Sequence, residues 1–209
     1  MFSSHRSGIG KAVFVLLCLI LTAAILTLSF LIYRTLSEPA EVTALRRLHV
    51  PEWVDVDLIR RDGASRRRTR LEALNAIVIH YIGNPGTSAQ NNRNYFDNPD
   101  STVSAHFIVG LEGEIIQCIP LHEKSSASNH RNRDTISIEV CHPDESGVFS
   151  PETYASLVRL TAWLCRECDL GADQIIRHYD ITGKICPSWF VDDEAAWETF
   201  KQDVMTAKE

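Results

Sequence analysis

The sequence feature that most constrains this chain is a run of 22 residues without a charged side chain, at positions 12–33. A helix crosses a bilayer core of roughly 30 Å with about 20 apolar residues, so the run is long enough to span a membrane. Arg6 and Lys11 precede the run and Arg34 follows it, a modest bias that favours a cytoplasmic N-terminus. We therefore expect a single-pass protein of the cell membrane, with everything after the run on the extracytoplasmic side.

Two other interpretations of this run are weaker. A cleaved signal peptide has an apolar region of about 7–15 residues that ends at a cleavage site with small residues. This run is longer, and no such pattern closes it. A lipoprotein signal at Cys18 would call for a small residue before the cysteine, where this chain has Leu16 and Leu17. A retained transmembrane anchor is the better prediction.

Length and charge limit what can follow the anchor. A chain of 209 residues has room for one core domain and an appendage. Its formal net charge of −6 argues against a nucleic-acid partner, because nucleic-acid-binding domains usually have a basic face. We expect a monomer with five parts: a cytoplasmic N-terminus at 1–11, the transmembrane anchor at 12–33, a tether at 34–50, one folded domain at 51–205 and a C-terminal tail at 206–209.

Two local features leave alternatives open. Residues 60–70 contain six arginines and one aspartate, which fits a solvated loop or attraction to anionic polymers of the wall or membrane. Five cysteines follow the anchor, so at least one is unpaired or bound to something. Cys118 and Cys141 could form a disulfide. Cys165 and Cys168 lie in a helical pattern and are best explained as small buried residues.

Apolar runs and capping residues predict the elements of the folded domain. Residues 74–80 form an apolar, β-branched run that is typical of a strand buried on both faces. Ser88 and Ser150 are suitable N-caps, and Pro151 suits the first position of a helix. The expected strands are 74–80, 104–109, 114–119, 135–141 and 175–178, and the expected helices are 88–96, 150–171 and from about 193 onward. This mixture predicts an α/β domain with a central mixed β-sheet flanked by helices.

Two histidines stand at the ends of predicted strands, where α/β proteins commonly build their sites. His80 ends one strand and His178 another, and Cys186 follows eight positions later across a turn. Two imidazoles and a thiolate are a suitable ligand set for zinc, and three protein ligands leave a fourth position for water, as in catalytic sites. From spacing alone, a structural role for these side chains is as good an explanation.

The wider sequence resembles a known family. The segments Ile-Val-Ile-His ending at His80, Ser-Ala-His-Phe ending at Phe107, Ser-Ile-Glu-Val ending at Val140, and the motif H-x5-K-x-C-P that starts at His178 occur in this order. Together they resemble the zinc-dependent N-acetylmuramoyl-L-alanine amidases of the phage-endolysin type, a family that includes bacterial amidases and peptidoglycan-recognition proteins. The resemblance covers about residues 51–204, and the closing motif is its most specific part.

The resemblance implies a zinc cofactor and a role for each site residue. The Zn²⁺ ligands would be His80, His178 and Cys186; some relatives have aspartate at the third position. Glu139 matches the acidic residue that some members use on the attacking water, and Lys184 matches the lysine that stabilises the oxyanion. Other members use a tyrosine in the strand where this chain has Ala105, so the proton transfer falls to Glu139.

The substrate implied by the resemblance is bacterial peptidoglycan, cut at the amide between N-acetylmuramic acid and L-alanine. His106 and Asn84 are expected to contact the substrate, although a buried, hydrogen-bonded histidine is an equally good interpretation of His106. Two alternatives remain. One is a non-catalytic peptidoglycan-recognition module, and the other is a thiol hydrolase with Cys186 as nucleophile and His178 as base.

Overall fold

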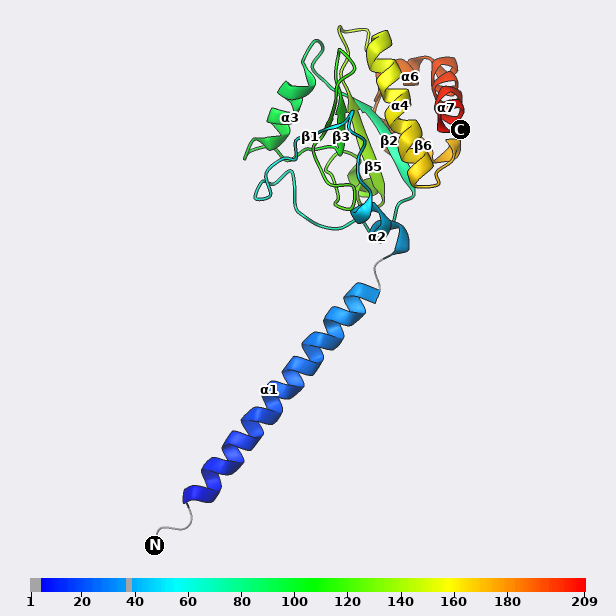
Figure 1. Ribbon diagram of the computed structural model, residues 1–209. Helices are drawn as coiled ribbons and strands as arrows, with labels where there is room; N and C mark the ends of the chain where they lie inside the picture. The colour runs from blue at the N-terminus through cyan, green and yellow to red at the C-terminus, as the bar shows by residue number, and fades with distance from the viewer. Residues whose placement is uncertain (1–4, 37–38) are drawn as a thin grey trace. The chain divides into compact units, whose positions relative to one another are not determined.

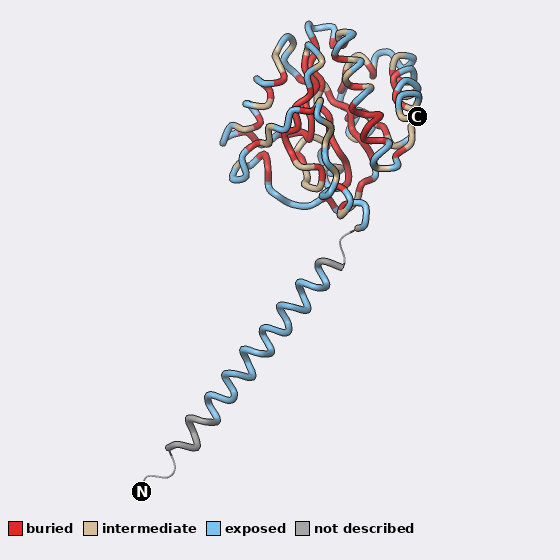
Figure 2. Tube along the Cα trace, viewed as in Figure 1, coloured by how far each residue is buried: buried red, intermediate tan, exposed pale blue. Residues whose placement is uncertain are grey.

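The computed structural model describes residues 5–36 and 39–209, with side chains described for 11–34 and from 39 onward. The chain divides into two compact units, Met1–Glu38 and Pro39–Glu209. The first unit contains helix α1 (His5–Leu36), which is exposed along its described length (Figures 1 and 2). Its segment Lys11–Arg34 has a mean hydropathy of 2.8 and is long enough to cross a membrane, although a signal sequence has the same properties.

The second unit is built on one six-stranded sheet with the strand order β1-β4-β3-β5-β2-β6. The strands are β1 (Asp55–Val56), β2 (Ala76–Tyr81), β3 (Phe107–Val109), β4 (Ile115–Gln117), β5 (Thr135–Val140) and β6 (Ile175–Arg177). Strands β3 and β4 are antiparallel, and every other neighbouring pair is parallel. The predicted α/β fold with a central mixed sheet is therefore confirmed.

Helices cover both faces of this sheet (Figure 1). They are α2 (Ala40–Arg47), α3 (Ala89–Asp97), α4 (Pro151–Glu167), α5 (His178–Thr182), α6 (Ser188–Asp192) and α7 (Glu194–Lys208), with 3-10 turns η1 (Asn129–Arg133) and η2 (Ala172–Gln174). Helices α4 and α7 pack on one face, against a core that includes Ile77, Ile79 and Ile138. Helix α3 packs on the other face, against Ile108 and Ile116. The sheet therefore separates two hydrophobic cores.

The helices begin where the capping residues predict. The Ser88 hydroxyl accepts a hydrogen bond from the Asn91 N–H at 3.2 Å, and the Ser150 hydroxyl accepts one from the Thr153 N–H at 3.1 Å. Asp193 caps α7 in the same way. Helix α4 is shorter than predicted, because it ends at Glu167 and the chain then turns into η2.

The segment predicted as a tether, residues 34–50, differs from that prediction. It contains α2, in which Val42 and Leu45 are three positions apart and therefore share one face. Both side chains are buried in the core that α4 and α7 cover, at 0% and 4% exposure. The folded unit therefore begins at Pro39, because this short helix completes the core instead of crossing solvent.

The arginine-rich stretch and the cysteines are also placed by the fold. Arg66 is buried and pairs with Glu123 at 2.9 Å, while Arg60 pairs with Asp62 at 2.8 Å on the surface. Part of this basic stretch is therefore structural. Cys118 and Cys141 are buried free thiols, so the disulfide considered for them is absent from the structure.

Candidate functional site

The parallel pairing of β2 and β6 brings the two site histidines together. Ile79 pairs with Arg177, so His80 and His178 follow at the same edge of the sheet. Their ring centroids lie 4.7 Å apart. Helix α5 then ends at Thr182, and the following Gly183, with a φ of 76°, turns the chain back. A hydrogen bond of 3.0 Å from the Tyr179 N–H to the Cys186 carbonyl holds the returning segment beside the histidines.

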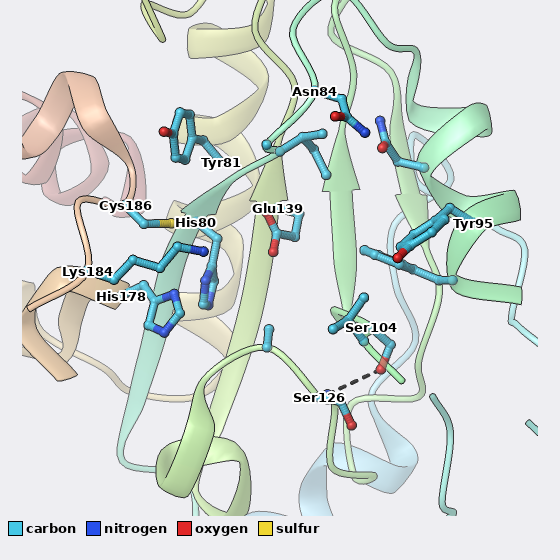
Figure 3. A pocket seen from close by; sticks show the side chains of 16 residues that line it. His80, Tyr81, Asn84, Tyr95, Ser104, Ser126, Glu139, His178, Lys184 and Cys186 are labelled. Atoms are coloured by element: carbon cyan, nitrogen blue, oxygen red, sulfur yellow. Dashed lines mark hydrogen bonds between the residues drawn. The ribbon is translucent and has the colours of Figure 1, made fainter. Parts of the chain in front are cut away.

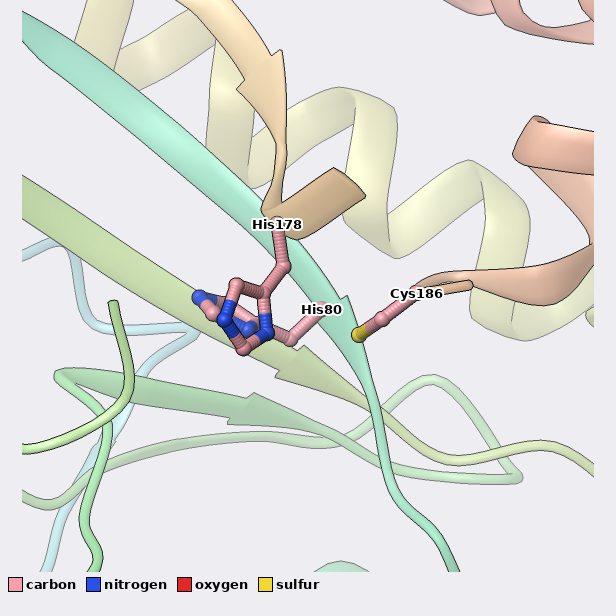
Figure 4. A group of neighbouring side chains, drawn as sticks. All are labelled: His80, His178 and Cys186. Carbon is pink, nitrogen blue, oxygen red and sulfur yellow. The ribbon is translucent and has the colours of Figure 1, made fainter. Parts of the chain in front are cut away.

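This arrangement places three side chains that could hold a metal ion around one point (Figure 4). One ligand atom from each of His80, His178 and Cys186 lies within 4.8 Å of the others, and all three residues are buried. The Nε2 atom of His80 lies 3.0 Å from the Ser128 hydroxyl, and that of His178 lies 2.8 Å from Asn129 Oδ1. The second ring nitrogen of each histidine thus remains for a ligand. Two imidazoles and one thiol fit the donor preference of zinc.

The buried surroundings affect the protonation of these groups. Burial lowers the pKa of His80 well below 6.5, with smaller effects from His178 and Lys184. Burial, followed by the charge of Lys184, also lowers the pKa of His178. Both imidazoles are therefore neutral near pH 7, as metal binding requires. Burial, with a smaller effect from Glu139, raises the pKa of the Cys186 thiol to about 12 although the charge of Lys184 opposes the rise, so the thiol is a poor nucleophile.

Glu139 lies beside the histidines on the neighbouring strand. It pairs with His80 across β5 and β2, so both side chains leave the same face of the sheet. Its neighbours Ile138 and Val140 face the core under α4 and α7, which confirms the predicted alternation. Glu139 Oε2 is buried and has no hydrogen-bond partner among the described residues. Burial raises the pKa of this carboxyl to about 8, and the charge of Lys184 opposes that rise.

These groups open into one pocket of about 310 Å³ (Figure 3). Six residues that the sequence predicts for the site line this pocket: His80, Asn84, Glu139, His178, Lys184 and Cys186. Further lining residues that the sequence analysis does not single out for the site include Tyr81, Asn92, Tyr95, Ser104 and Ser126. Lys184 is exposed at the pocket wall, and its charge acts on the Glu139 carboxyl. The pocket therefore combines a metal-binding set, a carboxylate and an ammonium group.

Comparison with known proteins agrees with this geometry. The protein-family model described as N-acetylmuramoyl-L-alanine amidase matches residues 70–189. The chain belongs to this family. It is 32% identical over 157 residues to N-acetylmuramoyl-L-alanine amidase CwlL of Bacillus licheniformis, covering 67% of this chain and 43% of the relative. It is also 32% identical over 161 residues to N-acetylmuramoyl-L-alanine amidase BlyA of Bacillus subtilis (strain 168). That match covers 67% of this chain and 43% of the relative. The chain thus spans less than half the length of these relatives.

Solved structures show the same fold. The catalytic domain of XlyA superimposes with a TM-score of 0.64 at 26% identity, covering 72% of this chain and 98% of that domain. The structure of PlyL gives a TM-score of 0.66 at 23% identity and covers 74% of this chain and 98% of that one. The resemblance to endolysin-type amidases noted from the sequence is confirmed.

His106 lies inside the fold and not in the pocket, in contrast to the substrate contact predicted for it. It is 0% exposed, and its Nδ1 accepts a hydrogen bond from the Ser137 N–H at 3.0 Å. Its Nε2 then donates to the Glu123 carbonyl at 2.9 Å. Both ring nitrogens are therefore used inside the fold, and burial lowers the pKa of the ring to about 4. The substrate-contact prediction is wrong for His106, and the buried alternative describes it.

Ser128 and Asn129, the partners of the two histidines, could not be identified from the sequence. They lie on a turn that enters η1, where no apolar period marks the residues. The only local signal is the polar run from Ser125 to Asp134, which predicts a loop and gives no direction for its side chains.

The raised pKa of Glu139, a half-buried residue with a desolvated carboxyl, leads to a prediction for the metal-free protein. Its pKa rises from 4.5 to about 8, so between these values the folded state holds a proton that the unfolded state has lost. Its contribution to stability is intact below about pH 4.5 and is lost as the pH rises through about 8. In chelator, Glu139→Gln should melt close to wild type at about pH 5 and above wild type at about pH 8.5, measured by calorimetry.

The matched control is Glu145→Gln, which changes an exposed carboxyl. This control should follow wild type at both pH values. A melting difference between Glu139→Gln and wild type that does not grow with pH would contradict the prediction.

Proposed function

We propose that this chain is a zinc-dependent N-acetylmuramoyl-L-alanine amidase, which hydrolyses the bond between N-acetylmuramic acid and L-alanine in peptidoglycan. The observation that carries the proposal is the pocket in which His80, His178 and Cys186 converge beside a buried oxygen of Glu139 that has no partner among the described residues. Membership of the amidase family supports the same substrate and reaction.

The proposed roles follow from what amide hydrolysis requires. An amide is a poor electrophile with a poor leaving group. When bound, zinc would polarise the scissile carbonyl and lower the pKa of water towards neutrality. Glu139 receives a proton from the attacking water at its free oxygen and later gives it to the leaving amine of L-alanine. A carboxylate beside the attacking water can accept that proton and later return it to the leaving group.

Lys184 contributes charge on the open side of the pocket. Its ammonium group stabilises the negative charge that develops on the carbonyl oxygen during attack. Because Lys184 is exposed and not packed in the core, its side chain is free to approach a bound muramyl peptide. Asn84, also at the pocket wall, is positioned to contact the substrate through its amide.

The two alternative functions find less support. A recognition module that binds without cutting has no need for a buried carboxylate oxygen beside a metal-binding set. A thiol hydrolase needs the thiolate of Cys186, but burial raises its pKa to about 12. The zinc amidase explains all of these features together.

The reaction itself is the first test. The full chain in detergent, incubated with purified muropeptides, should release peptides with a free L-alanine amine and leave an intact lactyl sugar, as seen by mass spectrometry. Wild type should hold about one zinc per chain by elemental analysis, and His178→Ala should lose both zinc and activity because two donors hold the ion weakly. Full zinc occupancy in His178→Ala would refute the ligand assignment.

Glu139→Gln separates catalysis from metal binding. The amide is nearly isosteric but cannot accept the proton, so zinc content should stay and kcat should fall about 10²–10⁴-fold with little change in KM. The contrast is Cys186→Asp, which changes the metal ligands and leaves Glu139 in place. Both variants are assayed on a muramyl peptide with zinc measured on the same samples. A wild-type rate in zinc-loaded Glu139→Gln would leave the carboxylate without a catalytic role.

We also propose that α1 anchors the enzyme in the cell membrane, with residues 39–209 on the extracytoplasmic side, where peptidoglycan lies. The support is the apolar segment Lys11–Arg34 and the lack of a cleavage pattern after it. N-terminal sequencing of the mature protein tests this, and the intact N-terminal segment should be found in the membrane fraction. A new N-terminus between residues 34 and 42 would identify a signal peptide instead. The monomeric state stays a prediction.

A further inference from the structure

We propose that Ser128 and Asn129 are positioning residues for the metal centre, holding the imidazoles of His80 and His178 with their free nitrogens towards Cys186. The inference rests on the proposed zinc site, since it concerns residues that act through its ligands. It deepens the proposal by adding a second layer of groups around the ligands, contributed by the turn before β5.

Two consecutive residues of one turn contact both histidines, one on β2 and the other at the start of α5. Ser128 Oγ lies 3.0 Å from His80 Nε2, and Asn129 Oδ1 lies 2.8 Å from His178 Nε2. Ser128 is 0% exposed, so its contact with His80 is shielded from water. A single segment therefore fixes the relative orientation of both rings, which lie 4.7 Å apart.

The Asn129 contact also selects which ring nitrogen of His178 is available. A carboxamide oxygen only accepts hydrogen bonds, so the His178 Nε2 at 2.8 Å must carry the proton and donate it. The Nδ1 atom then has its lone pair free, as a metal ligand requires. The Ser128 hydroxyl can likewise accept a hydrogen bond from His80 Nε2, which leaves Nδ1 of His80 as the free nitrogen. Partners of this kind orient metal-binding histidines and increase the basicity of the ligand atom.

The turn that carries both residues is itself rigidly held. Asn132 Oδ1 accepts hydrogen bonds from the N–H groups of Ala127 at 3.0 Å and Ser128 at 2.7 Å. The Thr135 hydroxyl donates to the Arg131 carbonyl at 2.7 Å and joins the turn to the first residue of β5. Because β5 pairs directly with β2, the turn is fixed to the same sheet that carries His80.

The backbone at Asn129 makes the side-chain role testable. Its φ of 54° is in the left-handed region, which glycine, asparagine and aspartate adopt most readily. Glycine would satisfy this backbone at least as well, so conformation alone does not account for an amide at this position. The contact with His178 does account for it. Asn129→Gly removes the acceptor without adding strain, and Asn129→Asp keeps an acceptor in the same place.

The experiment measures zinc affinity of the full chain in detergent by competition with a chromophoric chelator. Loss of such a partner typically weakens metal binding about 10–100-fold, which is the change expected for Asn129→Gly and for Ser128→Ala. Asn129→Asp should stay close to wild type. The control is Asp169→Gly, which makes the same backbone change at an exposed residue with a φ of 54° outside the metal pocket. Its affinity should equal that of wild type.

Substitution of cobalt for zinc gives a second measurement that does not depend on catalysis. The visible absorption of the cobalt site should change in Asn129→Gly and return towards wild type in Asn129→Asp. Wild-type zinc affinity in Asn129→Gly would overturn the inference and leave the zinc amidase proposal standing. Equal weakening in Asn129→Gly and Asn129→Asp would also overturn it, because the acceptor would then be irrelevant. Absence of zinc binding by the wild-type chain would overturn the metal site and this inference together.

Discussion

The parallel register of β6, β2 and β5 is the constraint on which the site depends. It sets Ile79 beside Arg177 and His80 beside Glu139, so that two histidines and a carboxylate reach one edge of the sheet. Side chains alternate between faces along a strand, and a slip of one residue would turn Glu139 into the core under α4 and α7. The apolar residues of these strands, such as Ile77 and Ile138, prevent that slip because both are buried in the core under α4 and α7.

The packing that fixes the register also desolvates ionisable groups in the site, which opposes folding. Glu139 has an oxygen without a hydrogen bond from any described residue, and the pKa values of Glu139 and Cys186 are both raised by burial. Such groups oppose folding locally and persist only where the surrounding structure is stable enough to hold them. Here the two cores on either face of the sheet provide that stability. A metal cation at the centre of the site would offset part of the cost, because it stabilises the deprotonated thiolate.

Much of the fold could be predicted from the sequence because local signals and tertiary structure agree. The strand at β2 and the caps at Ser88 and Ser150 have local physical causes, and the structure confirms them. Strand ends and a short motif were enough to single out the three proposed metal ligands. Helix α2 was missed because eight residues with two buried side chains give too short a period to distinguish from a linker. His106 was misassigned because alternation along a strand predicts which face a side chain leaves. Alternation does not show whether buried polar partners are present on that face.

The orientation of His178 illustrates why the remaining part of the site could not be predicted. Its main chain is fixed by Arg177, whose guanidinium donates to Asp180 at 3.0 Å and to Glu194 at 2.7 Å and so joins β6 to α5 and α7. Its ring is fixed from the other side by Asn129 on a turn before β5. The Asn129 contact spans 49 positions of the chain and the Glu194 contact spans 17. Asn129 lies on a turn without periodicity, and the helical pattern of α7 does not show which partner Glu194 has. The proposed ligands can thus be chosen from a short motif, whereas the orientation of their side chains depends on tertiary contacts that only the folded chain brings together.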